Sequence, residues 1–207
     1  MNPFSDPKVT RRFVILMAIA TFVMFSIWAV VRSYSLTPDG DYEVRQGDIF
    51  IGDGKFDKAL ERFDEALKVQ PNHRGALMGR ALAFMMSDRP VEAEAEFTYL
   101  INYLTKNVEP DDRTGIGTLA AAYNNRGILY DRQCRHKMAF DDYIQAIKID
   151  EGAVVGPGIV DKIIYGTPDP STARLRARFL HENMANLKDG ECLKHPEMDA
   201  EQRMYKP

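Results

Sequence analysis

Two short Cys/His motifs are the part of the chain with the strongest capacity for chemistry. Cys134 and His136 are separated by one residue, Cys192 and His195 by two, and the chain has no other cysteine. Zinc binds such residues, but neither spacing is that of a zinc finger, so we expect no metal site. Outside the cytoplasm Cys134 and Cys192 could form a disulfide that fastens the end of the chain to the region around residue 134. Sequence alone cannot place two cysteines within bonding distance, so this pairing stays open.

Two pairs of adjacent carboxylates are the other candidates for chemistry. Asp111-Asp112 lies in a polar, turn-rich segment, and Asp141-Asp142 lies on what we expect to be the exposed face of a helix. Solvation explains both pairs better than acid–base catalysis, which needs carboxyl groups held in a site. The chain also lacks a nucleophile elbow, a phosphate-binding loop, a dinucleotide fingerprint and a zinc-protease helix. We therefore expect no catalytic residue, no cofactor and no enzymatic activity.

The N-terminal segment is the most apolar part of the chain. Residues 13–31 carry no charge, and a helix over them would span about 28 Å, close to the thickness of a bilayer's hydrocarbon core. This run is longer than the core of a signal peptide, and no small-x-small cleavage site follows it. We therefore predict an uncleaved transmembrane helix over 13–31, with a linker over 32–39.

Positive charge predicts the orientation of this helix. Lys8, Arg11 and Arg12 precede the apolar run, whereas Arg32 is the only basic residue that follows it before Asp39. Basic flanks stay on the cytoplasmic side of a membrane. We expect residues 1–12 to be cytoplasmic and the rest of the chain to lie across the membrane, which in a bacterium places it in the periplasm on the inner (cytoplasmic) membrane.

Residues 40–73 have the pattern of two amphipathic helices joined by a tight turn at residues 52–54. The second helix has apolar residues at helical spacing, namely Phe56, Ala59, Leu60, Phe63, Ala66 and Leu67. Small residues on both helices allow their close approach, and Pro71 ends the second helix.

This segment resembles a tetratricopeptide (TPR) repeat, a 34-residue helical pair. The matching residues are Gly47, Phe50, Phe56, Ala59, Phe63, Ala66 and Pro71. A second copy covers 74–107, with Ala81, Phe84, Ala93 and Phe97 at the 34-residue shift. A third covers 120–153, with Tyr123, Gly127, Tyr130, Ala139, Tyr143 and Ala146. We expect the insertion between them, residues 108–119, to be a polar loop.

The resemblance implies an all-α fold. We expect an N-terminal transmembrane helix, a TPR α-solenoid of three helix pairs over 40–153, and a C-terminal capping helix with an extended tail over 154–207. Ser171 or Thr172 is a suitable N-cap for the last helix, which we predict to run to about Lys188. We expect its arginines, Arg174, Arg176 and Arg178, to lie on solvated faces; the alternative is that they bind lipid phosphates or an acidic partner.

In the TPR family the first helix of each repeat lines a concave groove. The corresponding residues here are Val44, Asp48 and Ile51 in repeat one, Met78, Leu82 and Met85 in repeat two, and Asn124, Asn125, Ile128 and Asp131 in repeat three. Such a groove is suited to an apolar or amphipathic segment of a partner, since methionine adapts to varied apolar surfaces. The alternative is that these side chains pack against neighbouring helices or against the chain's own tail. Val44 and Asp48 stand where relatives that grip acidic chaperone C-termini have basic and amide residues, so that clamp is absent.

Composition and charge argue against nucleic acid as the main partner. A hydrophobic content of 45%, a charged content of 28% and a net charge of −3 are typical of a globular protein and offer no strongly basic face for nucleic acid. The chain resembles bacterial membrane-anchored proteins with periplasmic TPRs. This resemblance implies an adaptor that acts as an assembly or chaperone-like factor for membrane or exported proteins. The alternative is a permanent accessory subunit of a respiratory or photosynthetic membrane complex.

Overall fold

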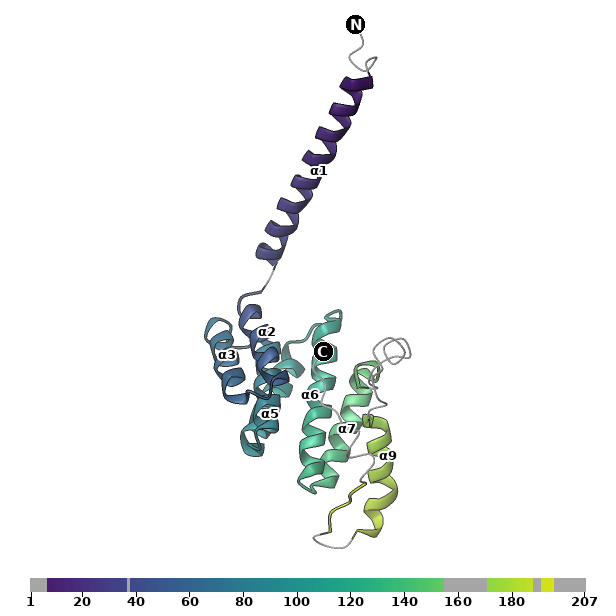
Figure 1. The fold of residues 1–207 in the computed structure, drawn as a ribbon. Coiled ribbons are helices and arrows are strands. Elements are labelled where there is room, and N and C mark those ends of the chain that lie inside the picture. The colour runs from purple at the N-terminus through teal and green to yellow at the C-terminus, as the bar shows by residue number, and fades with distance from the viewer. Residues whose placement is uncertain (1–6, 37, 155–170, 188–190, 196–207) are drawn as a thin grey trace. The chain divides into compact units, whose positions relative to one another are not determined.

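The computed structural model describes residues 7–36, 38–154, 171–187 and 191–195. Within these ranges the chain forms eight α-helices and two short 3-10 helices, with no strand (Figure 1). The predicted all-α class is therefore confirmed. The chain divides into two units, Met1–Asp39 and Gly40–Pro207. Predictions for residues 155–170, and for the tail beyond His195, lie outside the described residues.

The described residues of the first unit form a single helix, α1 (Pro7–Leu36). Within its segment Pro7–Arg32, an 18-residue stretch has a mean hydropathy of 2.6 and no buried residues, so the segment is long and apolar enough to cross a membrane. A signal sequence would have the same properties. The helix includes residues 32–36, which we predicted as linker, because the first helix-breaking residue after the apolar run is Pro38.

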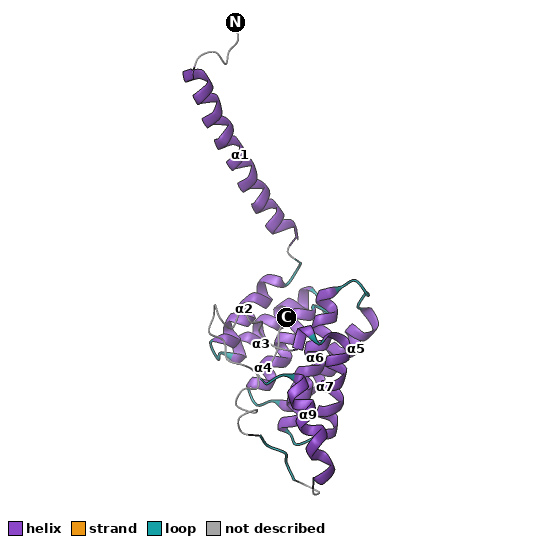
Figure 2. Ribbon diagram, turned by 90° about the vertical axis from the view of Figure 1, so that its right-hand side faces the viewer, coloured by secondary structure: helices purple, strands orange, loops and turns teal. Residues whose placement is uncertain are grey.

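The second unit is built from three consecutive helix pairs. Their helices are α2 (Asp41–Gly52) and α3 (Phe56–Val69), α4 (Arg74–Met86) and α5 (Pro90–Asn107), and α6 (Arg113–Arg132) and α7 (His136–Asp150). Each pair packs on the next through α3 with α4 and α5 with α6 (Figure 2). The second helices of the pairs bury Phe63, Phe97 and Tyr143, whose side chains are at most 1% exposed. Burial of each such ring contributes about 1.5–3 kcal/mol.

The turn inside each helix pair uses one residue in the left-handed conformation. Gly54, Asp88 and Cys134 have φ angles of 71°, 58° and 60°. A side chain disfavours this conformation, and glycine adopts it freely. The same turn therefore recurs in all three pairs, and in the third pair its strained position is held by a cysteine.

The predicted loop over 108–119 is wrong for most of its length, because α6 already begins at Arg113. The side chain of Asp112 accepts a hydrogen bond from the backbone N–H of Gly115 at 2.8 Å. It also accepts one from Arg74 at 2.6 Å. This N-cap starts the helix and offsets the low helix propensity of Gly115 and Gly117.

A further helix, α9 (Ala173–Asn183), packs on α7, as Figures 1 and 2 show. Thr172 is its N-cap and accepts a hydrogen bond from Leu175 N at 3.2 Å. The helix ends earlier than the predicted Lys188, and the 3-10 helix η3 (Met184–Asn186) follows it. After the end of α7, the 3-10 helix η2 (Gly152–Val154) places Val154 in the core.

Candidate functional site

The residues predicted to line a groove are mostly buried in the structure. Those at most 7% exposed are Val44, Met78, Leu82, Met85, Asn124, Asn125, Ile128 and Asp131. Asp48 and Ile51, both on α2, are half-buried. The alternative that these side chains pack against the chain itself accounts for this burial.

Two asparagines of α6 add polar groups to the residues that were predicted to line the groove. Asn125 Nδ2 lies 3.6 Å from Met78 Sδ and links α6 to α4. Asn124 is 1% exposed, and its Nδ2 has no acceptor among the described residues. A buried donor without an acceptor costs about 1–3 kcal/mol. A backbone carbonyl brought to Asn124 would remove that cost.

Asp131 is the centre of a buried polar cluster at the end of α6. Its carboxylate accepts hydrogen bonds from Arg176 Nε of α9, His136 Nδ1 at 3.1 Å, and Tyr143 Oη at 3.4 Å. The expectation that Arg176 is solvated is wrong, since it is 4% exposed and bonded to Asp131. Burial raises the pKa of Tyr143 well above its usual value, and the charge of Asp131 raises it further. The cluster joins α6, α7 and α9.

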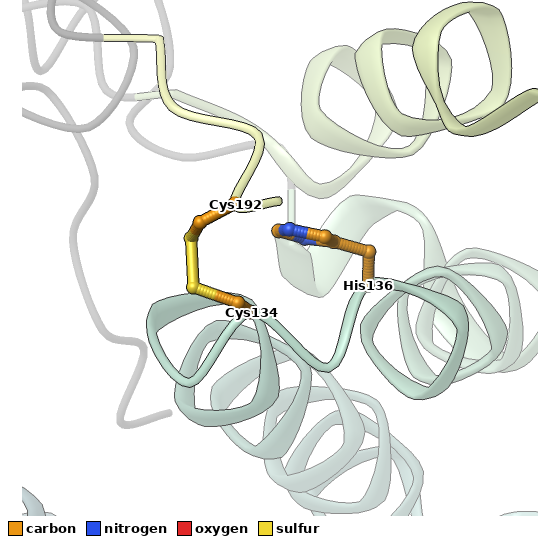
Figure 3. A group of neighbouring side chains, drawn as sticks. All are labelled: Cys134, His136 and Cys192. Carbon is orange, nitrogen blue, oxygen red and sulfur yellow. A yellow bond between two sulfur atoms is a disulfide. The ribbon is translucent and has the colours of Figure 1, made fainter. Parts of the chain in front are cut away.

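A disulfide joins Cys134 to Cys192 beside this cluster (Figure 3). It fastens the segment that contains residues 191–195 to the turn between α6 and α7. Next to it, the backbone N–H of Leu193 donates to His136 Nε2 at 2.9 Å. Since Nε2 accepts this bond, the ring proton lies on Nδ1 and is donated to Asp131.

The two Cys/His motifs of the sequence thus come together in part. Ligand atoms of Cys134, His136 and Cys192 lie within 4.8 Å of one another. His195 is not part of this group, and its ring packs edge-on against Phe179 at 5.3 Å. An open pocket of about 800 Å³, lined mainly by apolar side chains from the start of α7 and from η3, adjoins Cys134 and His136.

A repeated ion pair was missed by the sequence analysis. Arg126 Nε and Nη2 donate to Asp142 at 2.7 and 2.8 Å. Asp142, expected to be solvated, is instead 5% exposed. Arg80 makes the matching bonds to Glu96 one repeat earlier, at 2.8 and 3.0 Å. Burial raises the pKa of Asp142, while its hydrogen bond from Arg126 lowers it.

Comparison with known proteins identifies the helix pairs. Residues 44–103 match the sequence profile of the tetratricopeptide repeat family. The Sgt2 TPR domain from Aspergillus fumigatus has a TM-score of 0.52 at 15% identity, covering 78% of this chain and 94% of that one. The helix pairs have the tetratricopeptide repeat fold. The first TPR domain of human RPAP3 has a TM-score of 0.50 at 15% identity, covering 72% and 94%. The Arabidopsis OM64 TPR domain has a TM-score of 0.50 at 18% identity, covering 70% and 95%. No curated protein matches the chain.

The turn residues in the left-handed conformation and the arginines of the repeated ion pair each recur at one position of the TPR repeat. Gly54, Asp88 and Cys134 occupy one frame position, and Arg80 and Arg126 occupy another. The TPR fold is that of a protein-interaction scaffold. The cluster of Asp131, His136 and the disulfide lies where the third repeat meets α9.

Proposed function

We propose that this protein is a membrane-anchored TPR adaptor that binds a segment of another polypeptide. The TPR domain is the observation that supports protein binding, because stacked helix pairs give a continuous surface suited to chains. The apolar α1, with its unburied side chains, supports insertion in a membrane. The length of the apolar run and the lack of a small-x-small site after it support an anchor that is not cleaved. We place residues 1–12 in the cytoplasm and the TPR domain across the membrane, in a bacterium in the periplasm. The Cys134–Cys192 disulfide supports this side, since disulfides persist in oxidising compartments.

The partner segment that we propose is apolar or amphipathic. The face around Met78, Leu82 and Met85 offers apolar side chains, and Asn124 offers an amide donor for a backbone carbonyl. The first TPR of Spaghetti (RPAP3) binds the HSP90 peptide SRMEEVD, in which three of the last four residues are acidic. Val44 and Asp48 do not provide basic groups for such a peptide. Binding starts at the half-exposed Asp48 and Ile51 and requires the buried part of the face to open.

The role that we propose is that of an assembly or chaperone-like factor for membrane or exported proteins. Extraction in mild detergent followed by quantitative mass spectrometry tests it. If the protein is a transient factor, fewer than one partner molecule per chain is recovered, and this ratio changes with the expression level of the partner. A fixed stoichiometry to one membrane complex would identify a permanent accessory subunit, respiratory or photosynthetic, instead. A chain that sediments as a free soluble monomer would contradict both functions.

A further inference from the structure

The cluster beside the disulfide has the composition of a metal site. Two cysteine sulfurs and one imidazole nitrogen lie within 4.8 Å of one another. Thiolate and imidazole are the ligands that Zn²⁺ prefers, and two Cys with one His leave a fourth position for water. The disulfide occupies both sulfurs in the structure. The two cysteines can therefore bind a metal ion only after the disulfide has been reduced.

The surroundings of His136 are those of a metal-ligating histidine. Its Nδ1–H is held by the buried carboxylate of Asp131, at 3.1 Å. Metal-bound histidines are generally held in this way, and the carboxylate fixes the tautomer that leaves Nε2 as the ligand atom. Asp131 is itself held by Arg176 and Tyr143. The lone pair of Nε2 points to the segment of Cys192, since it accepts the N–H of Leu193.

Cys134 has a left-handed backbone conformation, which is unfavourable for a residue with a side chain. Its φ of 60° matches that of Gly54 in repeat one, where no side chain opposes the left-handed conformation. A residue in this conformation persists where the surrounding structure over-determines it, and here the bond to Cys192 holds the side chain. Cys134 and His136 also line the open pocket of about 800 Å³, which provides an entry path for a reductant and an ion.

We propose that Cys134, His136 and Cys192 form a redox-dependent zinc site. A small dithiol gives two electrons and two protons to the disulfide, so that two thiols form and the dithiol becomes its own disulfide. Zn²⁺ then displaces the two thiol protons, binds both sulfurs, and replaces the Leu193 N–H at His136 Nε2. Residues 191–195 remain fastened to the α6–α7 turn in both states, by a covalent bond when oxidised and by the ion when reduced.

Metal analysis of the full-length chain in mild detergent tests this proposal. The chain is reduced with a phosphine, given Zn²⁺, and separated from free metal by gel filtration. The reduced chain retains about one zinc ion per molecule, and the oxidised chain retains none above buffer. Reduced chain that keeps its helical circular dichroism but retains no zinc would overturn the proposal, as would equal retention by the Cys134→Ser, Cys192→Ser double variant.

Matched histidine variants test the third ligand. His136→Gln weakens zinc binding by at least about tenfold, whereas the same substitution at the exposed His181 leaves it unchanged. Equal affinity in both variants would remove His136 from the site. Cobalt(II) bound to the reduced unmodified chain provides a measurement that depends on no variant. Thiolate-to-metal charge-transfer absorption supports the two sulfur ligands, and its absence contradicts them.

Discussion

Gly47 on α2 lies directly against the ring of Phe63 on α3. A Cβ atom added to Gly47 would be 2.5 Å from Phe63 Cε1, a distance that no real contact tolerates. The same relationship recurs between Gly127 and Tyr143, where the added atom would be 3.0 Å from the ring. In the first and third pairs, the close approach of the two helices therefore depends on a glycine opposite an aromatic ring.

This contact predicts the effect of a single methyl group. Gly47→Ala forces the buried Phe63 ring or one helix to shift, and we expect a loss of about 1–3 kcal/mol in unfolding free energy. A Cβ atom added to Gly52, also on α2, would meet nothing within 4 Å. Gly52→Ala is therefore the matched control and should be neutral or slightly stabilising, by about 0.5–1 kcal/mol. Urea unfolding followed by circular dichroism compares them, and equal stability of the two variants would contradict the contact.

The buried pair of Arg126 and Asp142 predicts a non-additive double substitution. Arg126→Met leaves the carboxylate of Asp142 buried without its partner and should cost about 3–5 kcal/mol. Combination with Asp142→Leu removes the stranded charge, so the double variant should recover most of that loss. Denaturant unfolding of both single variants and the double variant gives the coupling energy. Additive losses would show that the two residues act independently.

Glu94 predicts a pH-dependent contribution to stability. Its hydrogen bond from Arg135 lowers the pKa of the carboxyl group below 4.5, and a hydrogen bond from Tyr130 lowers it further. The stabilisation is therefore present above the unfolded-state pKa and is lost as the pH falls through the folded-state pKa. Glu94→Gln should cost at most about 1 kcal/mol at neutral pH, because the pair is partly exposed.

Unfolding of the Glu94→Gln variant between neutral and acidic pH measures this effect. The difference from the unmodified chain should shrink as the pH is lowered. Glu61→Gln, at an exposed position on α3, is the control and should show no such trend. A difference that is constant across the pH range would disprove an electrostatic origin.

The Cys134–Cys192 disulfide predicts a large loss of stability on reduction without metal. The two cysteines are 58 residues apart, and a loop of that length corresponds to about 4 kcal/mol of chain entropy in the unfolded state. Denaturant unfolding of oxidised chain and of reduced chain in a chelator gives the difference. The Cys134→Ser, Cys192→Ser variant should unfold like the reduced chain, and a difference below about 1 kcal/mol would exclude a stabilising role.

The sequence predicted the helix pairs because their signal is local and repeated. Gly47 with Phe63 and Gly127 with Tyr143 have the same spacing, and each sits on a periodic apolar stripe. The early start of α6 was missed because glycines suggested a loop, whereas the capping contacts of Asp112 decide the helix start.

Hydrogen bonds between polar residues that are far apart in the sequence could not be predicted from the pattern of neighbouring residues. Arg176 and Asp131 are 45 residues apart and meet only because α9 packs on the third repeat. The pair of Arg126 and Asp142 did have a signal, because Arg80 and Glu96 show the same spacing one repeat earlier. Alignment of the charged residues of successive repeats would have found it.

Photo-crosslinking from two neighbouring positions of α2 tests the central claim most directly. One chain carries the crosslinker at Ile51, on the predicted groove, and another at Ile49, which is 64% exposed on a different face of the helix. In intact membranes of cells that express the protein, Ile51 should crosslink to another polypeptide and Ile49 should not. No crosslink from Ile51, or equal crosslinking from both positions, would contradict an adaptor that binds its partner along this face.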